Sequence, residues 1–348
     1  MSEKVTIKDI AKRTGTSITS VHRALHGTKG ISEELRKKIL LEVEKSNYRM
    51  DEAASMLRRE KFHIVVLLPK NEADERFYYS GLWDGIYRGA SEIEKNKVTI
   101  TYVEAVGGIG YISDALEKLF DETDENLHGL VTLCDDEASL NWVTRFIRRG
   151  TKVALIDRGT ILQGICCCIK TSSIDMGRLA VNMMHFLMKK DEGVLVLVNG
   201  PNQRVSYQEY FQGVKEKMRE LNMKQELVNF NGYEAESGKK QLINLLNSRD
   251  IKGIITSNAR ATYWVCEFFD NRTEFELPPI VGTDVFQELQ PFFESGILKA
   301  SIYQSHREHG EKAMKDLYEC LINPRMNYEK QTLGTLSLVV KENYKYFL

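Results

Sequence analysis

From residue 62 onward, short apolar runs of strand length alternate with segments of helical periodicity. Runs of this kind are typical of strands that are buried on both faces of a parallel sheet. The runs are 63–69, 97–105, 128–134, 151–157 and 164–170, and the helix-like segments between them are 78–94, 112–120 and 140–149. The alternation predicts a sheet built from repeated β–α units.

The same pattern restarts after residue 170. Helix-like segments at 176–189, 205–221 and 237–247 alternate with apolar runs at 194–200, 226–230, 251–256 and 278–283. We therefore predict an α/β domain of two lobes with two parallel sheets. Loops leave the carboxyl ends of parallel strands at one edge, so two such lobes place a ligand between them.

The first sixty residues have a different, all-α organisation. Thr6 is a plausible N-cap for a first helix, Gly15 ends that helix, and Ser17 can cap a second one. In the second helix Val21 and Leu25, four residues apart, can pack on the first and leave a polar face. Two short helices joined by a tight turn fit a helix-turn-helix, which presents its second helix to the major groove.

A third amphipathic helix, Glu33 to Ser46 after a cap at Ser32, would close a three-helix domain. Residues 1–60 carry thirteen Lys and Arg against nine Asp and Glu, a balance of +4, so the remainder holds −5 of the net charge of −1. This asymmetry predicts a polyanionic partner at the N-terminus. The alternative is an ordinary small helical bundle with a solvated basic face.

The run VTIKDIAKRTGTS, the Val21 to Leu25 core, SNY at 46–48 and the DEAASMLRR that follows resemble the LacI-type (lactose-repressor) family of bacterial transcription regulators. The resemblance implies a DNA-binding domain at 1–47, a hinge helix or linker at 48–61, and a ligand-binding domain at 62–348 similar to ribose-type sugar-binding proteins. It places the crossings between lobes near Lys170, Ile302 and Gln331. The implied N-lobe is about 62–170 and 303–330, and the C-lobe is about 171–302 and 331–348.

In the family, a hinge helix drives a leucine into the minor groove, as apolar wedges do. By this resemblance Leu57 is the wedge and Ala54 the close-packed alanine, whereas an ordinary linker helix would put Leu57 in a core contact. Asp51 and Ser55 depart from the usual asparagine and arginine, which should weaken the hinge contact or alter its sequence preference. The implied DNA contacts are Thr6, Ser17, Ile18, Thr19, Ser20, His22, Arg23, His26, Tyr48, Ala54 and Leu57.

The resemblance also implies a sugar site between the lobes. Tyr78 and Tyr79 stand where ribose-type binders sandwich the sugar between two aromatic rings. Gln208 replaces a usual arginine, which points away from an anionic effector, although Arg204 nearby could compensate; Ala259 replaces a common aspartate. The implied effector contacts are Tyr78, Tyr79, Asp157, Arg158, Gln208, Tyr233, Asn258, Asp284 and Gln304.

Other motifs favour structural roles. The six cysteines have no paired metal spacing and are expected to be buried reduced thiols, and we expect no metal and no cofactor. The glycines at 107–110 lack the remainder of a dinucleotide fingerprint, so a nucleotide-dependent enzyme is a weaker alternative. His306 and His309 are expected to be solvated, and the acidic run 135–137 to cap a helix start.

These observations predict a sequence-specific DNA-binding transcription regulator, a repressor, whose operator affinity is switched allosterically by a monosaccharide. A regulator that answers a nucleobase, a sugar phosphate or a protein co-regulator is the alternative. The start MSEKVTIKDI has no apolar signal core and no run of ~20 apolar residues follows, so we expect a cytoplasmic protein that associates with the nucleoid at its operator and makes no membrane contact. The regulator is expected to bind DNA as a homodimer, and the lack of a heptad pattern near Phe347 and Leu348 argues against a tetramer held by a C-terminal coiled coil.

Overall fold

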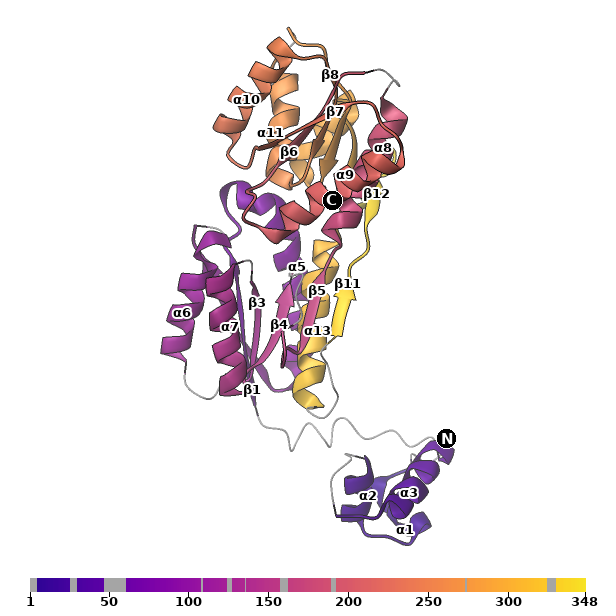
Figure 1. Ribbon diagram of the computed structural model, residues 1–348. Helices are drawn as coiled ribbons and strands as arrows, with labels where there is room; N and C mark the ends of the chain where they lie inside the picture. The colour runs from indigo at the N-terminus through magenta and orange to yellow at the C-terminus, as the bar shows by residue number, and fades with distance from the viewer. Residues whose placement is uncertain are drawn as a thin grey trace. The chain divides into compact units, whose positions relative to one another are not determined.

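The computed structural model describes residues 5–25, 30–46, 61–107, 109–123, 127–134, 136–156, 162–188, 192–272, 274–323 and 330–348. The chain divides into two compact units, Met1–Lys61 and Phe62–Leu348 (Figure 1). None of the helices in the described ranges is long and apolar enough to cross a membrane.

The first unit contains helices α1 (Ile7–Thr14), α2 (Ile18–Leu25) and α3 (Glu33–Lys45). The side chain of Thr6 accepts from the backbone N–H of Asp9, and the Asp9 carboxylate accepts from the backbone N–H of Thr6 at 2.9 Å, which is a capping box. Helix α1 ends at Gly15, whose φ of +67° lies in the left-handed region that glycine adopts without strain.

A small apolar core joins the three helices. Its buried members are Ile10 and Ala11 of α1, Val21 and Ala24 of α2, and Ile39 of α3. Val21 and Ala24 are three residues apart on α2, and the partly buried Leu35 and Val43 lie four residues on either side of Ile39 on α3, as on the apolar face of an amphipathic helix. The predicted helix-turn-helix with a third closing helix is confirmed.

The second unit begins with a six-stranded sheet in the order β11-β5-β4-β3-β1-β2, and all its neighbouring strands are parallel. Its strands are β1 (Phe62–Pro69), β2 (Val98–Ala105), β3 (Gly129–Leu133), β4 (Lys152–Ile156), β5 (Cys167–Lys170) and β11 (Lys330–Leu333). Alternate residues of β1 enter two cores. Ile64 and Val66 pack with α5 (Arg76–Ile93) and α13 (His306–Ile322), whereas Val65 and Leu67 pack with α6 (Ile112–Glu122) and α7 (Glu137–Arg149).

The second sheet has the order β12-β10-β9-β8-β6-β7, with β12 antiparallel to β10 and the other neighbours parallel. Its strands are β6 (Val194–Asn199), β7 (Glu226–Asn231), β8 (Ile251–Thr256), β9 (Ile280–Thr283), β10 (Leu298–Tyr303) and β12 (Ser337–Val339). Helices α8 (Ser173–Leu187) and α9 (Val205–Glu220) share a core on one face. Helices α10 (Ala235–Ser248), α11 (Ala259–Asp270) and α12 (Gln290–Ser295) lie over the other face (Figure 1). The predicted two-lobed α/β architecture is confirmed.

The chain passes between the two sheets three times. The passages follow β5 at 171–172, β10 at 304–305 and β11 at 334–336. The first two lie within two residues of the expected positions. The third lies beyond Gln331, because Gln331 pairs with Cys168 inside the first sheet. The first lobe therefore extends to Leu333, and the expected boundary at residue 331 falls within a strand.

Candidate functional site

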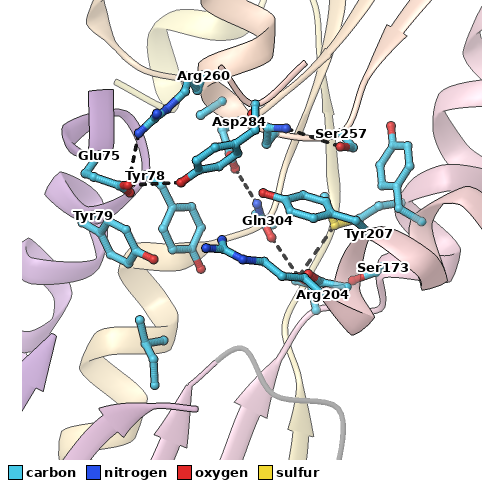
Figure 2. Close-up of a pocket in the computed structure, with 18 of the residues that line it drawn as sticks. Glu75, Tyr78, Tyr79, Ser173, Arg204, Tyr207, Ser257, Arg260, Asp284 and Gln304 are labelled. Carbon is cyan, nitrogen blue, oxygen red and sulfur yellow. Dashed lines mark hydrogen bonds and ion pairs between the residues drawn. The ribbon is translucent and has the colours of Figure 1, made fainter. Parts of the chain in front are cut away.

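A cavity of about 160 Å³ lies between the lobes, where the strands of both sheets end (Figure 2). One wall comes from the 3-10 turn η1 (Ala73–Glu75) and the start of α5 in the first lobe. The other comes from the starts of α9 and α11 and from the loops after β7, β8 and β9 in the second lobe. Six of the expected effector residues line it, namely Tyr78, Tyr79, Tyr233, Asn258, Asp284 and Gln304.

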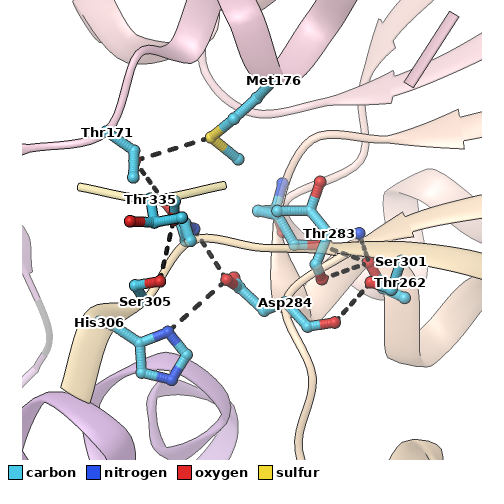
Figure 3. Close-up of polar contacts among 11 residues, drawn as sticks. Thr171, Met176, Thr262, Thr283, Asp284, Ser301, Ser305, His306 and Thr335 are labelled. Carbon is cyan, nitrogen blue, oxygen red and sulfur yellow. Dashed lines mark hydrogen bonds and ion pairs between the residues drawn. The ribbon is translucent and has the colours of Figure 1, made fainter. Parts of the chain in front are cut away.

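The buried carboxylate of Asp284 is held by a polar network that reaches the crossings (Figure 3). The side-chain amide of Gln304 donates to Asp284 Oδ1 at 2.8 Å, and the Thr171 hydroxyl donates to Gln304 Oε1 at 3.1 Å. The Ser305 hydroxyl donates to the backbone carbonyl of Thr335 at 2.9 Å, so hydrogen bonds join all three crossings. Asp284 and Ser305 both have left-handed backbones, with φ of +69° and +55°. Strained backbone of this kind is retained where the surrounding structure fixes it.

Two histidines next to this network are buried rather than solvated as expected. His306 is 4% exposed and its Nδ1 lies 3.8 Å from Asp284 Oδ1, and His309 is 2% exposed. The His306 ring lies 5.2 Å from the ring of Tyr78, and a Cβ at Gly81 would come within 2.2 Å of it. The charged residues that alternate with the histidines suggested a solvated segment, but both histidines fall on the inward face of α13.

The tyrosines of α5 form a corner of the cavity. The rings of Tyr78 and Tyr79 are 5.0 Å apart and nearly perpendicular, at 89°. Consecutive residues of an α-helix point about 100° apart, since the helix has 3.6 residues per turn. The two rings therefore do not form the parallel pair of walls that the family resemblance implied.

Charged side chains form part of the cavity wall, and of these only Arg204 and Asp284 had been considered from the sequence. The Glu75 carboxylate atom Oε1 lies 3.1 Å from Arg260 Nη2 and accepts from the Tyr233 hydroxyl, also at 3.1 Å (Figure 2). The Tyr233 ring lies 4.3 Å from the Arg260 guanidinium and 5.4 Å from that of Arg204. Burial, followed by the Glu75 charge, raises the pKa of Tyr233, so its phenol stays protonated and donates. Arg260 lies in the first turn of α11, directly after β8. Its position at a strand exit could have identified it from the sequence as a candidate for the cavity wall.

The remaining expected effector residues differ in their placement. Asn258 caps α11, because its Oδ1 accepts from the backbone N–H of Ala261 at 2.9 Å, so one of its polar atoms serves the helix. Gln208 lies outside the cavity lining, and its side chain donates to the Asn202 carbonyl at 2.6 Å. Asp157 and Arg158 lie outside the described residues.

The second helix of the first unit exposes its N-terminal side chains. Ile18 is 45% exposed and Thr19 is exposed, while the Ser17 hydroxyl caps the helix by accepting from the Ser20 N–H at 3.0 Å. The Arg23 guanidinium donates to the Gly30 carbonyl at 3.3 Å, which gives it a structural contact. The side chain of His22, together with His26, Tyr48, Asp51, Ala54, Ser55 and Leu57, lies outside the described residues.

Other motifs have structural explanations. Asp136 begins α7 with a capping box to Ser139, as expected for the acidic run; Asp135 is outside the described residues. All six cysteines are buried and none forms a disulfide, as expected for reduced thiols. Within the described residues, no group of three or more His, Cys, Asp or Glu side chains is arranged to hold a metal ion.

The chain combines a helix-turn-helix unit, a fold typical of nucleic-acid-binding domains, with a two-lobed α/β unit that has a cavity at its strand ends. This combination defines a class of ligand-binding proteins with an N-terminal helix-turn-helix domain. Residues 127–323, more than half of the chain, match the family model described as "Periplasmic binding protein domain". Residues 6–51 match the model described as "Bacterial regulatory proteins, lacI family". The chain therefore belongs to the periplasmic-binding-protein domain family, and its first unit carries a domain that matches the lacI family, as the resemblance in the sequence implied.

Known relatives are similar over parts of the chain, and solved structures over most of it. Catabolite control protein A of Streptococcus mutans is 33% identical over 84 residues, which cover 24% of this chain and only 25% of that relative. The structure of GanP, a glucose-galactose binding protein of Geobacillus stearothermophilus, has a TM-score of 0.70 at 17% identity over 82% of this chain and 99% of that one. The Lac repressor dimer bound to operator has a TM-score of 0.63 at 19% identity, covering 97% and 98%. Both structures show the fold alone.

Proposed function

We propose that this protein is a sequence-specific DNA-binding transcription regulator that acts as a repressor. The observation that carries the proposal is the helix-turn-helix, in which α2 starts with the exposed side chains Ile18 and Thr19, within the segment that matches the lacI family. A helix-turn-helix reads base edges with the N-terminal residues of its second helix. That one relative, catabolite control protein A, is itself named as a control protein supports a regulatory rather than an enzymatic role.

The hinge and the assembly belong to the same proposal. Residues 48–61 form the hinge, with Leu57 as the minor-groove wedge and Ala54 as its close-packed neighbour. The regulator works in the cytoplasm and as a homodimer. In the dimer two helix-turn-helix units, the reading heads, recognise the two half-sites of one operator.

The effector in this proposal is a small neutral sugar. The described lining holds three carboxylates, Asp74, Glu75 and Asp284, against the guanidinium groups of Arg204 and Arg260. Arg260 already lies 3.1 Å from Glu75 and 3.9 Å from Asp74, so this wall has no excess of positive charge to hold a phosphate. A cavity of about 150 Å³ is known to hold one benzene ring, so about 160 Å³ suits an effector with a single ring.

The switch in this proposal is a change in the relation of the two lobes. Tyr78 and Glu75 belong to the first lobe and Asp284 and Tyr233 to the second, so a ligand in the cavity touches both. A ligand shifts a conformational equilibrium only by its differential affinity for the two arrangements. Binding between the lobes therefore changes the spacing of the dimer's reading heads and so the operator affinity.

The test has two arms. Repeated selection of double-stranded DNA from a random pool by the purified protein should yield a palindromic consensus, and a pool without a consensus would contradict the regulator proposal. Gel shifts on the selected DNA are then repeated with D-ribose, D-galactose, D-glucose, myo-inositol, glucose 6-phosphate and adenine. We expect a neutral sugar to change the affinity; a response only to the phosphate or to adenine would overturn the assignment of the effector.

A further inference from the structure

A short segment of the first lobe reaches into the second lobe beside the cavity. Phe77 belongs to the first turn of α5, yet its ring is part of the apolar core of the second lobe. It stacks on Phe286 at 4.4 Å and 21° and lies 5.0 Å from the Tyr263 ring, and it is 2% exposed. Burial of this side chain therefore depends on the lobes being in contact.

Polar contacts flank this ring on both sides. Arg76 Nε lies 2.9 Å from Glu288 Oε1, and the same guanidinium lies 4.3 Å from the Phe77 ring centroid. On the cavity side, Glu75 contacts Arg260 and the Tyr233 hydroxyl at 3.1 Å each (Figure 2). Three consecutive residues of the first lobe thus each contact the second lobe.

The segment is also held firmly in its own lobe. A Cβ at Gly85 would lie 1.8 Å from the Arg307 carbonyl oxygen, and one at Gly89 would lie 2.8 Å from the Glu311 carbonyl oxygen, so α5 packs closely on the α13 backbone. Because α5 is fixed in this way, Phe77 cannot follow the second lobe without the first lobe moving too. A contact made by its first turn therefore acts on the lobe as a whole.

We propose that Glu75, Arg76 and Phe77 form an interlobe clamp that stabilises the closed arrangement and sets how readily the cavity opens. Opening exposes the Phe77 and Phe286 faces to water, which opposes it through the hydrophobic effect and the loss of ring stacking. The Arg76–Glu288 pair is about two-fifths exposed and contributes less energy, but it orients the segment. The clamp is a property of the chain alone; its effect on the effector response rests on the proposed function.

A clamp of this kind has a definite consequence for ligand binding. Phe77 and Arg76 lie outside the cavity lining, so a ligand does not replace their contacts. Weakening the clamp at Arg76 or Phe77 should therefore shift the lobes toward the open arrangement by the same factor whether or not a ligand is present, whereas Glu75 lines the cavity. The ligand then has to supply more differential affinity to close the cavity.

The experiment measures the distance between lobes with paired spin labels in the full chain. Labels are placed at Lys118→Cys on α6 and Lys240→Cys on α10, both exposed, while the native cysteines are buried. In Phe77→Ala the ratio of long to short distances should rise at least about tenfold, since tenfold corresponds to ~1.4 kcal/mol and a buried aromatic ring contributes at least that much. A distance distribution identical to that of the wild type would overturn the clamp.

A milder set of variants covers the case in which Phe77→Ala does not fold. Arg76→Glu places like charges at an exposed pair and should shift the distances toward the open form, and adding Glu288→Arg should restore them. If the double exchange fails to restore the short distance, the pair has no orienting role. Arg88→Ala, which breaks an exposed pair with Asp84 inside the same lobe, is the matched control and should change nothing. No DNA or sugar is present, so failure of the clamp and failure of the proposed regulator are distinguishable.

Discussion

The side-chain amide of Gln304 donates to the carboxylate of Asp284 at 2.8 Å, and so connects the second crossing between the lobes to a strand exit of the second lobe. Because Gln304 also accepts from Thr171 of the first crossing, two crossings and the cavity carboxylate form one network. Gln304 thus holds Asp284 in place and also lines the cavity, so the direct ligand contact that the family resemblance implied stays a prediction.

The first prediction concerns Asp284→Asn. Asparagine tolerates the left-handed backbone found there, so this change removes the carboxylate without adding backbone strain. Loss of one buried acceptor oxygen for a ligand hydroxyl costs ~1–3 kcal/mol, so the cognate sugar should bind about fivefold to a hundredfold more weakly in calorimetry on the full chain. Gln208→Ala, outside the lining, is the control and should bind normally. Equal affinity of Asp284→Asn and the wild type would remove Asp284 from the site.

The second prediction concerns the start of α2. Replacing Ile18 and Thr19 together with residues of different size and polarity should change the sequence recovered by DNA selection, because base-edge contacts specify sequence. Leu41→Ala on α3, where the side chain is 55% exposed, is a matched control and should leave the consensus unchanged. The reading-helix assignment fails if the double variant selects the wild-type consensus.

The third prediction concerns Leu57→Ala in the hinge. A wedge stabilises only kinked DNA, so this change should reduce affinity for the selected operator far more than affinity for unrelated DNA. Competition gel shifts at one fixed salt concentration measure both. Equal losses on the two DNAs would show that Leu57 is not inserted.

The fourth prediction concerns the cap of α1. Thr6→Ala should lower the free energy of unfolding of the first unit by about 1 kcal/mol, because the N-cap hydroxyl accepts a hydrogen bond from a backbone N–H of the helix. Hydrogen bonds from the Thr6 side chain and backbone hold the pKa of the Asp9 carboxyl below its usual value. The stabilisation of α1 by the Asp9 carboxylate is therefore complete above the usual carboxyl pKa of about 4. It is lost as the pH falls through the lower pKa that Asp9 has in the folded state.

Hydrogen exchange of α1 amides in the full chain tests this pH dependence. Asp9→Asn should exchange faster than the wild type near neutral pH, and the difference should disappear in acid as the wild-type carboxyl becomes protonated. A difference that grows as the pH falls would have the wrong sign for this cap.

The fifth prediction concerns the packing of α5 on α13. Gly85→Ala should destabilise the second unit by roughly 1–3 kcal/mol, because its Cβ would meet the Arg307 carbonyl oxygen. Gly110→Ala is the matched control, since a Cβ there has no neighbour within 4 Å. Thermal unfolding compares the two, and similar melting temperatures would argue against the close approach of α5 and α13.

Features set by neighbouring residues were determined by the sequence itself. The Thr6–Asp9 and Asp136–Ser139 caps each join residues three apart, so the pattern reveals them directly. The apolar runs also located nine strands, β1 to β9, because a strand covered on both faces needs apolar residues, but they did not include β10, β11 or β12. The family motifs supplied the order of the two units.

Contacts between distant segments were decided only by the tertiary structure. Glu75 meets Arg260, 185 residues away, and Thr171 meets Gln304, 133 residues away, so no local pattern could pair them. The burial of His306 and His309 follows from the close approach of α13 to α5 and to the crossings. Burial and pairing depend on which faces meet, and that depends on how the two lobes pack.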